Sequence, residues 1–128
     1  MKTQPGEIHW CELMTRDPKA AESYFAAVAG WQSRAIAMGE QTSPYLLCEA
    51  NGHPVAGIMD ISDAENDDLD AGWTTFVHVE DVDRVCARTI ELGGHVVRKP
   101  TDIDLAGRVA VVTDPTGARI GLITPNDG

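Results

Sequence analysis

The sequence predicts an α+β fold made of two tandem βαβββ modules, and three observations lead to this prediction. Two amphipathic helical segments have the same length and the same start and stop signals. Each helix follows one strand-like segment and precedes three more. The capping residues Asp17 and Asp81 are 64 residues apart, which is half of the 128-residue chain. A repeat of this length indicates that one supersecondary unit occurs twice.

Both helices carry clear boundary signals. Asp17 is a side-chain cap followed by proline at the first helical position, and Gly30 is a left-handed stop. Asp81 caps the second helix and Gly94 follows it at the same distance of 13 residues. Apolar residues recur at helical spacing in both segments, the first set being Ala21, Tyr24, Phe25 and Val28.

Short apolar segments bounded by turn residues predict the strands. In the first module we expect strands at Ile8–Met14, Trp31–Met38, Tyr45–Glu49 and Pro54–Ile61. In the second we expect them at Thr74–Val79, His95–Arg98, Arg108–Thr113 and Arg119–Ile123. The modules cover about residues 7–62 and 73–125 of a single domain of residues 1–128. The acidic segment Asp60–Asp70 is interpreted as a solvated linker between them.

Composition restricts the classes of partner. The chain has 20 acidic and 10 basic residues, and its net charge of −10 repels nucleic acids and anionic membranes. No apolar run approaches the roughly 18 residues that span a bilayer, and no signal-peptide core is found, so we expect a cytoplasmic protein. The three cysteines form no CxxC pair, which is typical of buried thiols in a reducing compartment.

Several short motifs occur in an order that resembles a known family. They are the segments Trp10–Asp17, Tyr24-Phe25, Gly30-Trp31 and Asp114–Ala118. Their order and spacing resemble the vicinal oxygen chelate superfamily, also called the glyoxalase/bleomycin resistance/dioxygenase superfamily. The run Gly107–Pro115 is similar to an actinobacterial branch of proteins named as hydroxylases or secreted antigens. The resemblance implies that the modules form cupped mixed sheets around a central cavity, where a divalent metal polarises substrate oxygens.

The resemblance also implies where metal ligands would lie, on the first and last strands of each module. Those positions hold Trp10, Thr74, Gly121, and either Ala56 or Gly57. None of these is a strong ligand, so the sequence predicts no metal site and no other cofactor. His9 adjoins Trp10, but alternation along a strand points it to the opposite face.

With Trp10 and Thr74 facing the cavity, alternation assigns further residues to the same surface. The predicted ligand-binding residues are Trp10, Glu12, Met14, Thr74, Phe76, His78 and Arg119. Glu12 and His78 are the catalytic candidates, as an acid/base pair. The alternative is that Glu12 forms a structural ion pair with Arg119 and that His78 is a half-buried, satisfied imidazole. We also expect the tryptophans Trp31 and Trp73 to pack each sheet against the helix of its own module.

Three classes of function remain. The favoured one is metal-independent binding of an apolar or aromatic small molecule, as in resistance or sequestration proteins. The alternative is a glyoxalase- or dioxygenase-type enzyme, either a metal-free acid/base catalyst using Glu12 and His78 or a metal-dependent one. The third is a structural or assembly role, so the sequence leaves open whether the protein is an enzyme. We expect a homodimer, because open sheets leave edges and apolar faces that relatives commonly cover by dimerising.

Overall fold

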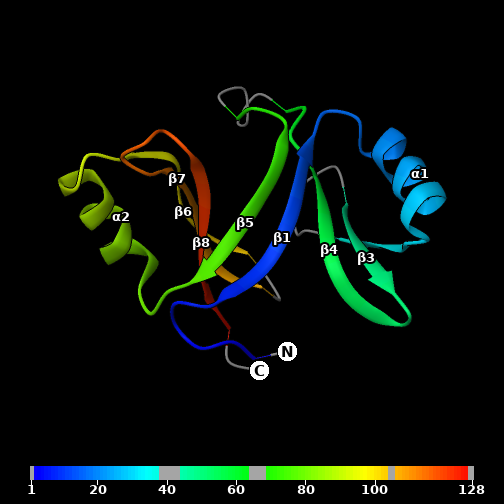
Figure 1. Cartoon of the computed structure of the whole chain (residues 1–128), viewed down its shortest axis with the longest axis horizontal. Coiled ribbons are helices and arrows are strands. Elements are labelled where there is room, and N and C mark those ends of the chain that lie inside the picture. Colours follow the sequence, from blue (N-terminus) through cyan, green and yellow to red (C-terminus); the bar gives the residue numbers. More distant parts are fainter. Residues whose placement is uncertain (1, 38–43, 64–68, 104–105, 127–128) are drawn as a thin grey trace. The chain divides into compact units, whose positions relative to one another are not determined.

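The computed structural model describes residues 2–37, 44–63, 69–103 and 106–126, which contain eight strands and two helices (Figure 1). The chain divides into two compact units. The first unit consists of residues 11–73, and the second unit consists of residues 1–10 and 74–128. Each unit is described by itself below. The strands β1 (Ile8–Thr15) and β5 (Gly72–His78) each have residues in both units.

The first unit contains one helix and a mixed sheet. Its elements after β1 are α1 (Pro18–Ala29), β2 (Gln32–Ile36), β3 (Tyr45–Ala50) and β4 (His53–Asp60). The strands β2, β3 and β4 are antiparallel neighbours, and β4 pairs in parallel with β1. Cys48, Ala56 and Ile58 form the buried core, against which Ala21 of α1 and Leu46 of β3 also pack.

The second unit repeats this arrangement. Its elements after β5 are α2 (Val82–Glu91), β6 (His95–Ile103), β7 (Gly107–Thr113) and β8 (Arg119–Pro125). The strands β6, β7 and β8 are antiparallel neighbours, and β8 pairs in parallel with β5. The core joins α2 to the sheet and consists of Val82, Cys86, Ala110, Val112 and Leu122.

Local chemistry explains the helix boundaries. The Asp17 side chain accepts a hydrogen bond from the Ala20 N–H at 3.1 Å, and the Asp81 side chain accepts one from the Arg84 N–H at 3.2 Å. These bonds satisfy N–H groups that have no partner within the helix. The first helix stops at Gly30, whose φ of 69° lies in the left-handed region that favours glycine. The predicted α+β class and the βαβββ order are therefore confirmed.

The ends of the strands β6 and β2 differ from the expectation. The strand β6 continues to Ile103 instead of ending at Arg98, and its pairing with β7 shifts register twice on the way. Such bulges break the alternation that marks a strand in sequence. The strand β2 ends at Ile36, and Met38 lies outside the described residues, as do residues 64–68 of the acidic linker.

The two tryptophans behave differently from each other. Trp31 stacks on Phe25 of α1 with centroids 5.0 Å apart, as expected. The expectation for Trp73 was wrong, because its ring lies edge-on to Phe25 and Trp31 at 5.5 Å and 6.1 Å. Trp73 belongs to the first unit, and it packs there with Phe25 of α1. Neither helix in the described segments is long and apolar enough to cross a membrane.

Candidate functional site

Two histidines of the second unit share one hydroxyl group. The Thr3 Oγ1 atom lies 2.7 Å from His9 Nδ1 and 2.8 Å from His78 Nδ1. The two imidazole rings meet edge-on, with centroids 6.1 Å apart and an interplanar angle of 78°. His78 is the last residue of β5, and all three side chains are half-buried. We call these three residues the histidine cluster.

Backbone hydrogen bonds place Thr3 beside the end of β5. The Gly6 N–H donates to the His78 carbonyl at 2.8 Å, and the His78 N–H donates to the Glu7 carbonyl at 2.9 Å. A turn joins Gln4 to Glu7, in which the Glu7 N–H donates to the Gln4 carbonyl at 3.0 Å. The Glu7 carboxylate accepts from the Gln4 N–H at 2.6 Å. The segment before β1 is therefore held against β5 by main-chain bonds as well as by the cluster.

The shared hydroxyl determines where the protons are when both imidazoles are neutral. A threonine hydroxyl donates one hydrogen bond, so it donates to one Nδ1 and accepts from the other. One imidazole then carries its proton on Nδ1 and has a lone pair at Nε2, whereas the other has the opposite tautomer. Burial, and next the neighbouring His78, lower the pKa of His9. The cluster thus favours neutral His9 and provides a proton acceptor together with a hydrogen-bonded path between the rings.

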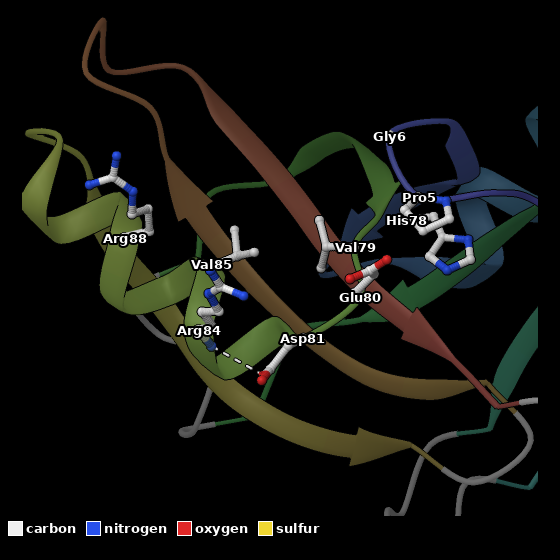
Figure 2. A pocket seen from close by; sticks show the side chains of 9 residues that line it. All are labelled: Pro5, Gly6, His78, Val79, Glu80, Asp81, Arg84, Val85 and Arg88. Atoms are coloured by element: carbon white, nitrogen blue, oxygen red, sulfur yellow. Dashed lines mark hydrogen bonds between the residues drawn. The ribbon is translucent and has the colours of Figure 1, made fainter.

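An open cavity of ≈ 340 Å³ adjoins His78 in the same unit (Figure 2). In Figure 2, His78 and Pro5 lie at one end of the lining and Arg88 of α2 lies at the other. The cavity is lined by Pro5, Gly6, His78, Val79, Glu80, Asp81, Arg84, Val85 and Arg88. Five of these nine residues are ionisable, and the volume lies at the lower end of the range for small-molecule sites.

The cations and anions that line the cavity are partly committed to each other. The Arg88 guanidinium lies 3.1 Å from the Glu91 carboxylate, and the Asp81 carboxylate caps α2. The Arg84 guanidinium has no ion-pair partner within the described part of the chain. The charges of Glu80 and Asp81 nevertheless balance the two arginines, so the cavity is not strongly selective for an anion.

The predicted residues of β5 differ in burial. Thr74 and Phe76 are buried and His78 is half-buried. Phe76 lies opposite Gly121 of β8, and a Cβ atom built on Gly121 would lie 2.7 Å from Phe76 Cγ and closer still to two other ring carbons. The Phe76 ring therefore occupies the space where a side chain at Gly121 would be.

Arg119 and His78 lie at different positions along the paired strands β5 and β8 of the second unit. His78 is paired with Ile123 of β8, whereas Arg119 is at the start of that strand. Four residues of a strand span about 13 Å, so the two side chains belong to opposite ends of the β5–β8 pair. Both are half-buried, as is Trp10 on β1.

In the first unit, an aromatic residue again covers a glycine. Glu12 of β1 pairs with Gly57 of β4, and a Cβ atom built on Gly57 would overlap the phenol of Tyr45, 2.5 Å from its Cε2. Glu12 is 8% exposed and Met14 is fully buried. Because Gly57 and Gly121 are 64 residues apart, the same position of each module is a glycine whose open side holds a ring.

Comparison with known proteins identifies the family. Residues 7–122 match the model of the Glyoxalase/Bleomycin resistance protein/Dioxygenase superfamily. The chain belongs to this superfamily. It is 32% identical over 121 residues to "Putative glyoxylase CFP32" of Mycobacterium tuberculosis, a match that covers 94% of this chain and 46% of that protein. It is 29% identical to "Anthracycline biosynthesis protein DnrV" of Streptomyces peucetius, covering 97% of this chain and 43% of that protein.

This superfamily member spans less than half the length of these two curated relatives. Among solved structures, a methylmalonyl-CoA epimerase of Streptomyces coelicolor superposes with a TM-score of 0.65 at 15% identity. The match covers 97% of this chain and 100% of the epimerase chain. The epimerase of Mycobacterium tuberculosis has a TM-score of 0.61 at 18% identity, covering 99% of this chain and 94% of that chain. At these identities the likeness concerns the fold alone.

The resemblance assigns the family's ligand positions to Trp10, Thr74, Gly121 and either Ala56 or Gly57, and the absence of a metal site at these positions stays a prediction. Trp10, Thr74 and the two glycines supply at most one hydroxyl oxygen, whereas a metal site needs several imidazole, thiolate or carboxylate donors. Both glycines also face an aromatic ring at the point where a ligating side chain would have to start. Across the described segments, no three His, Cys, Asp or Glu residues gather in a way that could hold a metal.

The prediction from sequence included His78 but omitted its two partners. Thr3 had no role in it, and His9 was considered only as a substitute metal ligand pointing away from the cavity. Thr3 and His78 are 75 residues apart, so no local pattern connects them. The available signal was that His9 lies next to the start of β1 and that His78 is the last residue of β5. The seven predicted ligand-binding residues remain a prediction.

Proposed function

We propose that this protein is a small-molecule-binding member of its superfamily that works without the family's metal ion. The observation that carries the proposal concerns Gly57 and Gly121, which occupy equivalent positions of the two modules. An aromatic ring packs directly against each of these glycines. A glycine there supplies no donor atom, and the ring beside it supplies apolar surface instead. Binding would then depend on shape and on apolar contact rather than on chelation of vicinal oxygens.

The ligand class that suits these surfaces is an apolar or aromatic compound. A phenol ring lies beside Gly57, a phenyl ring lies beside Gly121, and a cavity of ≈ 340 Å³ adjoins the histidine cluster. One relative is named for anthracycline biosynthesis, which makes an anthracycline a suitable first probe. The proposed role is sequestration or resistance in the cytoplasm. The three free cysteines, of which Cys48 and Cys86 are buried, suit a reducing compartment.

The test combines elemental analysis with ligand binding on the purified chain. We expect far less than one Zn, Ni, Fe or Mn per chain. We also expect chelator to leave both the melting temperature and the affinity for an anthracycline probe, measured by its fluorescence, unchanged. Close to one metal ion per chain, together with loss of binding after chelation, would overturn the proposal. A relevant control is the same titration with an unrelated acidic protein, which reports nonspecific binding.

A second function is a metal-free acid/base enzyme in which His78 is the base. The observation in its favour is the hydroxyl shared by two imidazoles, because it orients His78 and leaves one ring nitrogen available to accept a proton. Solved structures of the same fold are named as methylmalonyl-CoA epimerases, which suggests a carbon acid as test substrate. In deuterium oxide, such an enzyme would exchange the acidic C–H of methylmalonyl-CoA faster than buffer does. Exchange no faster than in buffer would rule out this substrate class.

A further inference from the structure

The cavity at the start of α2 lies where the first unit is closed by a buried side chain. Pro5 and Glu80 line this cavity. At an offset of 64 residues, the equivalent positions of the first unit hold Leu69 and Arg16. Leu69 is 3% exposed, and the Arg16 guanidinium donates a hydrogen bond to its carbonyl at 2.9 Å. Pro5 is exposed instead, and the Glu80 side chain makes no such bond within the described segments. The fold can therefore close this space, and the open cavity results from the residues of the second unit.

The wall that the segment before β1 contributes to the cavity is held in place by several hydrogen bonds. The Gly6 N–H donates to the His78 carbonyl at 2.8 Å, and Thr3 Oγ1 lies 2.8 Å from His78 Nδ1. The His78 N–H in turn donates to the Glu7 carbonyl at 2.9 Å. A preformed wall reduces the ordering that binding requires, so even a small ligand can bind through a few contacts.

Two opposite charges that line the cavity are unpaired among the described residues. The Glu80 carboxylate and the Arg84 guanidinium form no hydrogen bond or ion pair with any other residue of that part of the chain. In contrast, the Arg88 guanidinium pairs with Glu91 at 3.1 Å, and the Asp81 carboxylate accepts a hydrogen bond from the Arg84 N–H. The cavity therefore offers one carboxylate and one guanidinium to a ligand.

The surface beside these two charges is apolar. Pro5, Val79 and Val85 line the same cavity. In Figure 2 the two valines lie between His78 at one end of the lining and Arg88 at the other. Methylene groups gain free energy when they leave water for such a surface. The lining thus suits a molecule in which a short hydrocarbon chain connects an ammonium group to a carboxylate.

We infer that this cavity binds a small zwitterion, with its ammonium group at Glu80 and its carboxylate at Arg84. A compound with a single charge leaves one of these side chains without a partner, whereas a zwitterion pairs with both. The net charge of −10 also repels a plain anion, and a zwitterion carries no net charge. This ligand site goes beyond the proposed function, because it does not depend on the rings beside Gly57 and Gly121.

The probes are 6-aminohexanoate and two analogues of the same chain length that each lack one charge, hexanoate and hexylamine. Binding is measured at about pH 7.5 from backbone amide signals in NMR titrations, because these signals also report where each probe binds. We expect 6-aminohexanoate to shift the amide signals of His78, Arg84 and Val85, with a dissociation constant on the order of 1 mM for a probe of this size. Each analogue should bind about threefold more weakly or worse, because an exposed ion pair contributes modestly.

Two variants assign each charge of the probe to one side chain. Glu80→Gln removes the partner of the ammonium group, so 6-aminohexanoate should bind no better than hexanoate. Arg84→Gln removes the partner of the carboxylate, so 6-aminohexanoate should bind no better than hexylamine. Both positions are exposed, so both variants should keep a melting temperature close to wild type. The matched controls are Glu49→Gln and Arg34→Gln, which make the same charge changes in an ion pair of the first unit and should keep both differences.

Two kinds of result would overturn the inference. The first is that 6-aminohexanoate leaves the amide signals of the cavity residues unchanged, or that hexanoate or hexylamine binds as tightly as 6-aminohexanoate does. The second is that either difference persists in its matching variant or disappears in its control. These titrations use neither a metal ion nor an aromatic probe, so their outcome is independent of the test of the proposed function.

Discussion

The contact between Gly121 and Phe76 leads to a quantitative prediction for the substitution Gly121→Ala. The new methyl group would lie 2.7 Å from Phe76 Cγ and closer to two more ring carbons, so the ring must move. Phe76 is 5% exposed, and its surroundings are packed. Overpacking of this kind costs about 1 to 3 kcal/mol of unfolding free energy. The lower backbone entropy of alanine in the unfolded chain returns about 0.4 to 1 kcal/mol.

The expected net loss is therefore about 1.5 kcal/mol in unfolding free energy. With an unfolding entropy of about 2.1 cal/mol/K per residue, a chain of this length loses about 4 °C of melting temperature per kcal/mol. Gly121→Ala should then lower the melting temperature by about 6 °C. In the background Phe76→Ala the ring is absent, so the same substitution should be neutral or should stabilise by up to about 1 kcal/mol.

The assay is urea unfolding of the wild type, both single variants and the double variant. Phe76→Ala alone is expected to cost about 3 to 5 kcal/mol, and Phe76→Leu replaces it in the cycle if that variant does not fold. The decisive quantity is the change of sign of the Gly121→Ala effect between the two backgrounds. If Gly121→Ala destabilises the protein equally with and without the ring, the ring does not occupy the space above Gly121. The structural basis of the proposed function would then be lost.

Three further predictions concern titration and capping. His9 has a lowered pKa, mainly because it is partly buried, so the unfolded chain binds this proton more readily and the stability of the fold falls as the pH decreases below the ordinary histidine pKa of about 6.5. His9→Gln should therefore flatten the dependence of melting temperature on pH between 7 and 5. Asp17→Ala should cost about 1 kcal/mol in chemical unfolding, whereas Asp17→Ser should cost less. Arg108 donates hydrogen bonds to Asp83 and Asp102, and the bonds to Asp83 lower the pKa of that carboxyl group. Arg108→Gln should raise the pKa of Asp83 in an NMR titration, and its effect on stability should vanish as the pH falls below that pKa.

The features that could be predicted from sequence are those that depend on neighbouring residues. Both helix starts follow from side-chain caps three residues before the N–H that they satisfy, and the hairpin at Asn51-Gly52 follows from two residues with positive φ. The predicted end of β6 was wrong because the strand continues through bulges, and these bulges depend on how β6 pairs with β7. The contact of Tyr45 with Gly57 requires the register of β3 on β4, which no local pattern specifies.

The two modules have different residues at one pair of equivalent positions, which are occupied by Glu12 in the first unit and by Phe76 in the second. In the second unit, the neighbour of Gly121 on the adjacent strand is Phe76, and its own ring fills the space above the glycine. In the first unit the equivalent neighbour of Gly57 is Glu12, and the ring is supplied instead by Tyr45 on the other side of the glycine. Because Tyr45 fills that space, position 12 does not have to be aromatic for packing. The position is therefore open to a carboxylate, and Glu12 is 8% exposed there.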